Sequence, residues 1–155
     1  NGVNTAFAQN VPNTHYCGWR YNDRLRYCRS PKVGATAAQL GTAFIGCPES
    51  AANAAYRTAL TGPGAFKTEM VTALSGRLAR SLPNKFTAFA QTLAGQACPA
   101  YPLAYDMAKA LNTAAQNQGE YGFAAQWAGQ GAPLARSLPA ASLMASLKAE
   151  LESAL

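Results

Sequence analysis

The residue types that could do chemistry are few, and the most suggestive of them lie in one short stretch. Residues Gln39–Phe44 read QLGTAF, inside the apolar run Thr36–Ile45 that Gly34 and Gly46 bound. A strand that ends in Gly-Thr can turn backbone N–H groups and a hydroxyl toward a phosphate. A buried strand that ends in a glycine turn, without any ligand, is the commoner origin of such a pattern.

The cysteines and the single histidine, His15, do not make a metal site. The four cysteines are Cys17, Cys28, Cys47 and Cys98, and no pair has the two-residue gap of a zinc knuckle or a redox dithiol. We therefore predict no metal, and expect Cys47 and Cys98 to be small apolar residues in a reduced core.

Several catalytic sequence motifs are absent, which excludes the enzyme classes that depend on them. No GxSxG elbow, Walker loop or HExxH motif occurs, and the carboxylates are scattered, with no pair typical of a glycosidase. The chain has 155 residues, of which 49% are hydrophobic and 13% are charged, which allows one domain with a core and disfavours disorder. The longest apolar run is interrupted by polar residues, so we expect no membrane-spanning helix; we also expect no signal peptide.

The charge is concentrated at the start of the chain. Residues 1–32 contain five basic side chains and one acidic one, a net charge of +4, whereas the other residues carry only +2. The segment HYCGWRYNDRLRYCR interleaves aromatic residues with arginines, a pattern that can stack bases and neutralise phosphates. It has neither helical nor strand periodicity, so a nucleic-acid binder built on this segment is kept as an alternative only.

The elements that must position these residues are mostly helical. Besides the strand at Thr36–Ile45, the pattern predicts a strand or a helix at Lys67–Leu74, and helices at Ala51–Leu60, Asn84–Ala94, Tyr101–Gln116, Tyr121–Ala128 and from Ser137 or Pro139 onward. Two of these helices have a clear apolar face. The one after Asn84 is expected to present Phe86, Phe89, Ala90 and Leu93, and the final helix Leu143, Met144, Leu147, Leu151 and Leu155.

Four stretches together resemble a known family. In order, they are GATAAQLGTAFIGCPESAANAAYRTAL, SGRLARSLPNKF, YPL and QWAGQGAPLARSLPA. They are similar to the C-terminal part of nitronate monooxygenases, the flavin enzymes long called 2-nitropropane dioxygenases. The likeness runs from about Val33 to the end of the chain, and WAGQ at Trp127–Gln130 is its most specific motif.

The resemblance implies a fold and a cofactor. The family is a TIM barrel that binds FMN, with the phosphate held by loops near its last two strands, the usual phosphate site of such barrels. The fold class expected is therefore α/β: the C-terminal portion of an FMN-binding (β/α)8 barrel plus a helical C-terminal region, mostly α in this chain. By resemblance, the residues that contact the FMN phosphate are Gln39, Leu40, Gly41 and Thr42.

The segment before Val33 departs from the family, which has a strand and a glycine loop of the form AAGGI there. When Asn13–Lys32 is written as degenerate codons and read from the second base, the permitted reading is IPIIAAGGIMTGSGIAAALK, and Trp19-Arg20 forces a glycine. This reading leads directly into VGATAAQLGTAF. We therefore hypothesise that residues 1–32 are a frameshifted, poorly ordered head, from a damaged gene or a sequencing error, and that residues 33–155 are the barrel portion.

The activity implied is flavin-dependent oxidation of alkyl nitronates by dioxygen to carbonyl compounds and nitrite. The partners expected are thus a small-molecule nitronate and dioxygen, with no nucleic acid and no membrane. The family's histidine near the flavin comes from an earlier part of the barrel and His15 lies in the suspect head, so no catalytic residue is assigned. Without the head the chain has two cysteines and no histidine, as in a reduced cytoplasmic enzyme.

The length sets a further expectation. A closed (β/α)8 barrel typically needs about 250 residues, so we expect this chain alone neither to turn over nitronates nor to retain FMN through gel filtration. Another flavin barrel oxidoreductase, such as an enoyl reductase, shares the glycine loop and QxGT and is the enzymatic alternative.

Three further residues lie in family-like stretches and are candidates for a substrate pocket: Tyr56, Arg77 and Tyr101. Packing or surface ion pairing is the alternative for each of them. Trp127 is expected to lie on a helix with Phe123 and to anchor the core.

Overall fold

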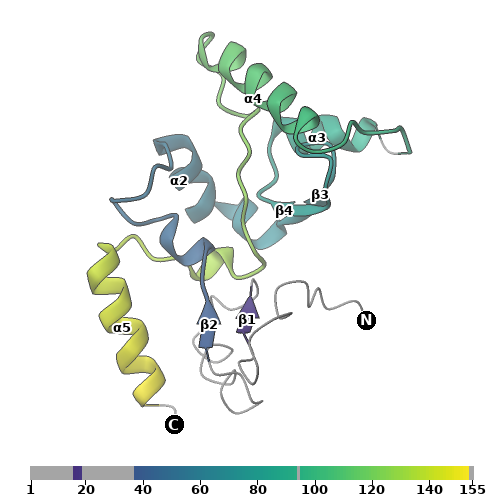
Figure 1. Ribbon diagram of the computed structural model, residues 1–155. Helices are drawn as coiled ribbons and strands as arrows, with labels where there is room; N and C mark the ends of the chain where they lie inside the picture. Colours follow the sequence, from purple (N-terminus) through teal and green to yellow (C-terminus); the bar gives the residue numbers. More distant parts are fainter. Residues whose placement is uncertain (1–15, 19–36, 94, 154–155) are drawn as a thin grey trace. The chain divides into compact units, whose positions relative to one another are not determined.

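The computed structural model describes residues 16–18, 37–93 and 95–153 (Figure 1). The chain forms two compact units: a first unit of Asn1–Ala51 together with Leu134–Leu155, and a second unit of Ala52–Pro133. Within the described ranges, none of the helices is long and apolar enough to cross a membrane. The frameshift hypothesis concerns residues 1–32, of which only residues 16–18 are described, so it stays a prediction.

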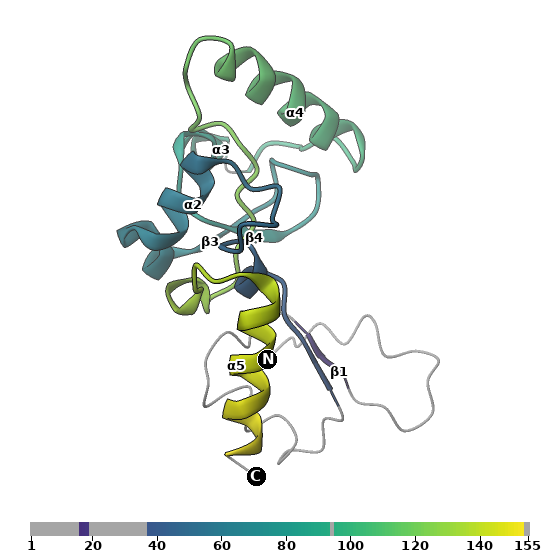
Figure 2. The same cartoon turned by 90° about the vertical axis from the view of Figure 1, so that its left-hand side faces the viewer.

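The first unit contains a parallel strand pair. Strand β1 (Tyr16–Gly18) lies beside strand β2 (Ala37–Gln39), with Tyr16 opposite Ala37 and Gly18 opposite Gln39 (Figure 2). The strand predicted at Thr36–Ile45 is thus correct only in its first part. After Gln39 the chain turns into a short 3-10 helix η1 (Thr42–Phe44), because Gly41 adopts helical backbone angles and its carbonyl accepts the Phe44 N–H.

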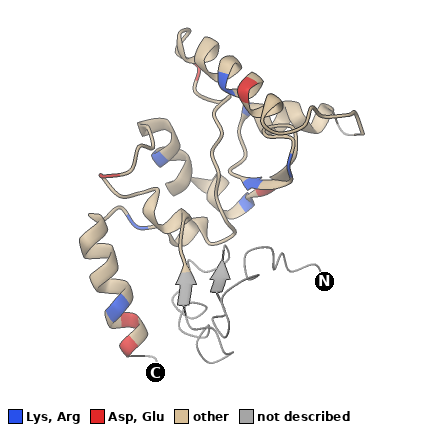
Figure 3. Cartoon of the chain, in the orientation of Figure 1, with Lys and Arg blue, Asp and Glu red and all other residues tan. Residues whose placement is uncertain are grey.

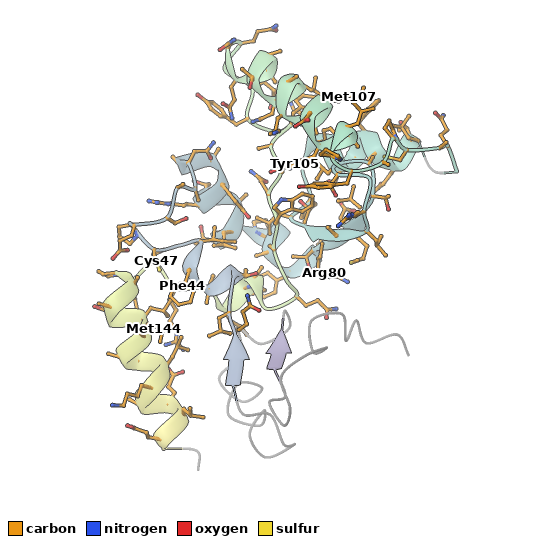
Figure 4. All side chains as sticks on the ribbon, in the orientation of Figure 1. Phe44, Cys47, Arg80, Tyr105, Met107 and Met144 are labelled. Carbon is orange, nitrogen blue, oxygen red and sulfur yellow. The ribbon has the colours of Figure 1, made fainter. Side chains whose placement is uncertain are left out.

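The core of the first unit joins the end of β2 to the last helix, α5 (Ala140–Glu152). Leu143 of α5 is 2% exposed and belongs to one cluster with the buried Cys47, as predicted for both residues (Figure 4). Met144, predicted to share the apolar stripe, is instead 54% exposed, because this small core covers a narrower face of α5 than the sequence pattern indicated. Leu147 packs against the cluster, whereas Leu155 lies outside the described residues.

Two polar contacts hold α5 within the first unit, one at each end of the helix. The Glu49 carboxylate accepts the Ala140 N–H at 3.0 Å and so satisfies a helix N-terminal donor. Near the C-terminal end of α5, Glu150 forms an ion pair with Arg136 at 2.8 Å. Charged side chains gather in this part of the helix (Figure 3). A charge pair and a capping carboxylate therefore hold the last helix to the segments that precede it.

The second unit is mostly helical, with one small antiparallel sheet. Its elements are α2 (Ala54–Thr61), η2 (Pro63–Lys67), β3 (Glu69–Val71), β4 (Ala79–Ser81), α3 (Lys85–Thr92) and α4 (Leu103–Gln116), followed by η3 (Ala132–Leu134) where the two units join. Strand β3 pairs with β4 through Met70 opposite Arg80. The core cluster consists of Val71, Leu74, Phe86 and Ala108.

Three of the predicted helices in this unit are confirmed, with ends shifted by a few residues. Helix α3 begins after Asn84, whose side chain accepts the Thr87 N–H at 3.0 Å in a capping box. Phe86 is buried as predicted, but Phe89 is 48% exposed, so the apolar face of α3 is narrower than expected. The predicted strand at Lys67–Leu74 is present as the shorter β3.

The helix predicted at Tyr121–Ala128 is wrong. Its first half contains a turn and a bend, and its second half pairs with the edge of β4: the Leu82 N–H donates to the Gln126 carbonyl at 2.8 Å, and the Ala128 N–H donates to the Arg80 carbonyl at 3.1 Å. Because its backbone groups pair with a distant strand, they are not available for helical bonds. Trp127 therefore packs against the core from an extended segment and not from a helix.

Candidate functional site

The predicted phosphate-binding residues form a turn at the end of β2. Within it, the Phe44 N–H donates to the Gly41 carbonyl at 3.0 Å, and the Ile45 N–H donates to Thr42 at 3.3 Å. In a 3-10 turn the first N–H groups do not take part in the turn's own hydrogen bonds. This donor set, with the Thr42 hydroxyl beside it, suits a phosphate oxygen.

The four predicted residues do not have equal access to a ligand. Gln39 and Gly41 are exposed and Thr42 is half-buried, whereas the Leu40 side chain packs against the first-unit core. Leu40 can therefore face a ligand only through its backbone. The turn offers backbone amides, one hydroxyl and one amide side chain, with the leucine as its anchor.

Gly41 has no structural requirement for glycine within the described residues. Its φ of −107° is open to any amino acid, and a Cβ placed on it would have no described atom within 4 Å. A glycine is nevertheless useful where a ligand must approach the backbone closely. The described residues of the turn therefore fit a bound phosphate group, because they include hydrogen-bond donors and leave the position of a Cβ on Gly41 clear.

A second set of chemical side chains lies in the second unit, and we call it the aromatic array: Arg77, Tyr101, Tyr105 and Trp127. The Arg77 guanidinium carbon is 4.8 Å from the centre of the Tyr101 ring. The Tyr101 and Tyr105 rings are stacked with centres 6.5 Å apart, and Tyr105 lies 6.5 Å from Trp127. Of these four residues, Tyr105 lies on α4 and is labelled in Figure 4. The array is a series of neighbouring aromatic rings with a cation at one end.

Tyr56 joins the array at its other end. Its hydroxyl donates a hydrogen bond to the Trp127 carbonyl oxygen. Burial raises the pKa of the Tyr56 hydroxyl above its ordinary value, because the phenolate would be poorly solvated there. The folded chain thus keeps this proton where the unfolded chain loses it, so the group's contribution to stability is present below a pH of about 10 and declines above it.

All three pocket candidates predicted from the sequence therefore belong to one assembly. Arg77 and Tyr101 are in direct contact, and Tyr56 reaches them through Trp127 and Tyr105. Sequence reasoning missed Tyr105. Its signal was the spacing of four from Tyr101, which places two side chains on the same face of a helix.

A lysine on α4 adds a second positive charge beside the array. The Lys109 ammonium is 5.1 Å from the centre of the Tyr105 ring and forms an ion pair with Asp106 at 2.8 Å. The hydrogen bond and charge of Asp106 raise the pKa of the exposed Lys109. Because Asp106 offsets the Lys109 charge, Arg77 is the stronger candidate for attracting an anion.

The prediction that both cysteines lie in the core is wrong for Cys98, whereas Cys47 is buried as predicted. Cys98 is exposed, since it lies in the loop before Pro99, and its thiol points to the Thr72 carbonyl at 3.8 Å. Among the described residues, neither Cys47 nor Cys98 forms a disulfide. Over the described residues, no group of three or more histidine, cysteine or acidic side chains is placed to bind a metal.

The second unit also contains a cavity of about 840 Å³ between β3, α3 and α4. Its apolar lining includes the partly exposed side chains Met70, Phe89, Met107 and Leu111. None of the side chains predicted as a site residue lines it. The cavity and the aromatic array are therefore separate features of this unit.

Comparison with known proteins gives the family of the chain. The family model described as nitronate monooxygenase matches residues 32–150. The nitronate monooxygenase of Pseudomonas aeruginosa is 55% identical over 120 residues, which is 77% of this chain and 34% of that protein. The enzyme of Paraburkholderia phytofirmans is 53% identical over 77% of this chain and 33% of its own length. The chain thus spans about a third of the length of these curated relatives.

Solved structures of two enzymes are also similar to this chain. The nitroalkane oxidase of Streptomyces ansochromogenes matches with a TM-score of 0.81 and 37% identity, over 93% of this chain and 41% of that one. FabK of Thermotoga maritima matches with a TM-score of 0.71 at 21% identity, over 92% of this chain and 45% of that one, and so shows a shared fold alone.

The chain shares its fold with enzymes of the TIM-barrel class. The part of that fold that it forms is mostly helical with small sheets. The chain belongs to the nitronate monooxygenase family, a family of enzymes. The family match begins at Lys32, next to the change in composition from which we separated residues 1–32 from residues 33–155.

Proposed function

We propose that residues 33–155 are the C-terminal part of an FMN-dependent nitronate monooxygenase that oxidises alkyl nitronates with dioxygen to carbonyl compounds and nitrite. The observation that carries the proposal is the 55% identity with a nitronate monooxygenase over 120 residues. The matched family region, residues 32–150, includes both QLGTAF and WAGQ. The parallel strand pair that precedes the turn also agrees with the end of a parallel barrel.

In this proposal the turn at Gln39–Thr42 holds the phosphate of FMN. The amides that open η1 and the Thr42 hydroxyl donate to the phosphate oxygens, and Gly41 allows them to come close. When bound, FMN supplies the capacity to accept electrons from the substrate and pass them to dioxygen. The contribution of this chain is to bind and orient the cofactor through its phosphate.

The aromatic array is the proposed surface for the substrate. Alkyl nitronates are small anions with an apolar tail, which suits a row of aromatic rings with an arginine at one end. Tyr56 donates a hydrogen bond to the Trp127 carbonyl, so in this proposal it orients the array. The thiols of Cys47 and Cys98 are compatible with a reducing compartment, and we propose a cytoplasmic location for the protein.

A flavin enoyl reductase is the second candidate, favoured by the shared fold with FabK. That likeness is at 21% identity, whereas the nitronate monooxygenase of Pseudomonas aeruginosa is 55% identical over 120 residues, and the family match at residues 32–150 contains WAGQ. We therefore rank nitronate oxidation first. A nucleic-acid binder has no support from the family match, which begins at Lys32 and leaves out the basic head.

A composite enzyme tests the proposed function. In it, residues 33–155 replace the matched C-terminal region of the Pseudomonas aeruginosa relative. We expect this composite enzyme to consume dioxygen and release nitrite with propyl-1-nitronate, within about tenfold of the unaltered relative, since only family-equivalent contacts change. Oxidation of a nicotinamide cofactor coupled to reduction of an enoyl thioester, without nitrite release, would instead support the enoyl reductase.

A further inference from the structure

The backbone around Gly76 lies directly against the chain that enters α4. Gly76 has a φ of +73°, and a Cβ there would lie 2.8 Å from the Tyr101 nitrogen and would also clash with the Pro99 carbonyl oxygen. Only glycine fits this approach. The Gly76 N–H donates to Thr72 at 2.8 Å, which fixes the turn. Arg77, the next residue, is therefore held beside Tyr101 by the backbone itself.

A buried serine fixes Arg77 further. Ser75 is 8% exposed, and its hydroxyl donates to the Arg77 carbonyl at 3.1 Å. With the backbone settled on both sides, the Arg77 side chain extends over the Tyr101 ring, 4.8 Å from its centre. That distance is within the range of an energetically significant cation–π contact.

Tyr101 needs such a partner because core packing does not fix its ring. The side chain is 50% exposed, and its other ring contact is the stacked Tyr105, with an interplanar angle of 25°. An aromatic ring that is half in solvent rotates between rotamers unless contacts on its faces restrict it. Among the described residues, the Arg77 guanidinium and the Tyr105 ring contact the Tyr101 ring in this way.

We infer that Arg77 is a positioning residue: its guanidinium holds the Tyr101 ring in the orientation that extends the aromatic array. The role of the array in substrate binding rests on the proposed function, whereas the contact between Arg77 and Tyr101 is independent of it. A planar guanidinium stacks on a ring more effectively than an ammonium, so lysine should replace Arg77 only in part.

The contact is tested on the full chain by nuclear magnetic resonance with carbon-13 in the tyrosine rings, and Tyr101→Phe assigns the Tyr101 signal. We expect Arg77→Met to shift and broaden the Tyr101 and Tyr105 ring signals, and Arg77→Lys to restore them in part. The matched control is Arg80→Met, since Arg80 donates to the Thr68 carbonyl at 2.6 Å and should leave both rings unchanged. Unmoved Tyr101 signals in Arg77→Met overturn the inference.

A second measurement keeps the test decisive if Arg77→Met does not fold. In the unsubstituted chain, the Arg77 side-chain protons should resonate upfield of their usual positions because they lie over the ring, and Tyr101→Leu should return them. Arg77 protons at their usual positions in the unsubstituted chain overturn the inference without any substitution at Arg77.

The consequence for substrate is measured in the composite enzyme. Arg77→Met should raise the KM for propyl-1-nitronate about 2- to 5-fold, the size of an exposed cation–π contact, with kcat changed less, and Arg77→Lys should lie between. An unchanged KM together with displaced Tyr101 signals contradicts the substrate role of the array and leaves the positioning intact. The two failures are therefore distinguishable.

Discussion

Replacing Gly41 by glutamate in the composite enzyme is expected to abolish retention of FMN. The new carboxylate would lie at the turn where the proposal places the phosphate, and two like charges about 4 Å apart repel by about 4 kcal/mol at a protein surface. That corresponds to a loss of roughly 10²- to 10³-fold in FMN affinity. The measurement is flavin absorbance that stays with the protein after gel filtration, together with a titration of the flavin-free protein with FMN.

The matched control for this experiment is Gly41→Ala. A Cβ at Gly41 has no described atom within 4 Å and the backbone angles suit alanine, so the fold should tolerate the change. We expect Gly41→Ala to weaken FMN binding much less than Gly41→Glu and to leave the melting temperature unchanged. If Gly41→Glu binds FMN as tightly as the parent composite enzyme, the phosphate does not lie at this turn.

The second large effect concerns the head of the chain. We propose that residues 1–32 are a frameshifted translation. If the part of the composite enzyme taken from this chain is extended to begin at Asn13, we expect the enzyme to retain no FMN. Replacing residues 13–32 by IPIIAAGGIMTGSGIAAALK should restore one FMN per chain, because the glycine loop supplies the other half of the phosphate site of a parallel barrel. The control is a scrambled segment of the same composition.

Two observations support this proposal. The corrected reading predicts a strand that includes positions 16–18, where β1 lies parallel to β2, and the family match begins at Lys32, where the corrected reading ends. The coding DNA gives the direct answer. If its second reading frame does not encode two adjacent glycines at the positions of Trp19 and Arg20, the frameshift is excluded.

Local signals in the sequence predicted most of the helices. Asn84 is an example: its side chain bonds to an amide three residues along, so the start of α3 can be read from neighbouring residues alone. Helix α4 likewise follows from its own periodicity. The end of β2 was placed too late, because Gly41 and Thr42 continue an apolar run although their backbone turns.

Long-range pairing explains the main error. The segment Tyr121–Ala128 has helix-compatible residues, but its backbone bonds to β4, which lies some 45 residues earlier in the chain. No pattern inside the segment encodes that partner. The exposure of Met144 and Cys98 has a similar origin, since the size of each core depends on how distant segments meet.

The turn of the candidate site was predicted better than the aromatic array, because the array depends on contacts between distant segments. The turn at Gln39–Thr42 is contiguous, so the motif alone located it, although the burial of Leu40 depends on distant packing with α5. Tyr56, Arg77 and Tyr101 were found as separate residues. Their assembly required Tyr105 and Trp127, which connect segments far apart in the sequence.

The central claim is that residues 33–155 complete a barrel that binds FMN, and the flavin content of the composite enzyme tests it most directly. The protein is purified, passed through gel filtration and denatured, and the released flavin is identified and counted per chain. The account predicts one FMN per chain, whereas the 155-residue chain by itself retains none. A folded composite enzyme without flavin, or the 155-residue chain alone with stoichiometric FMN, would contradict it.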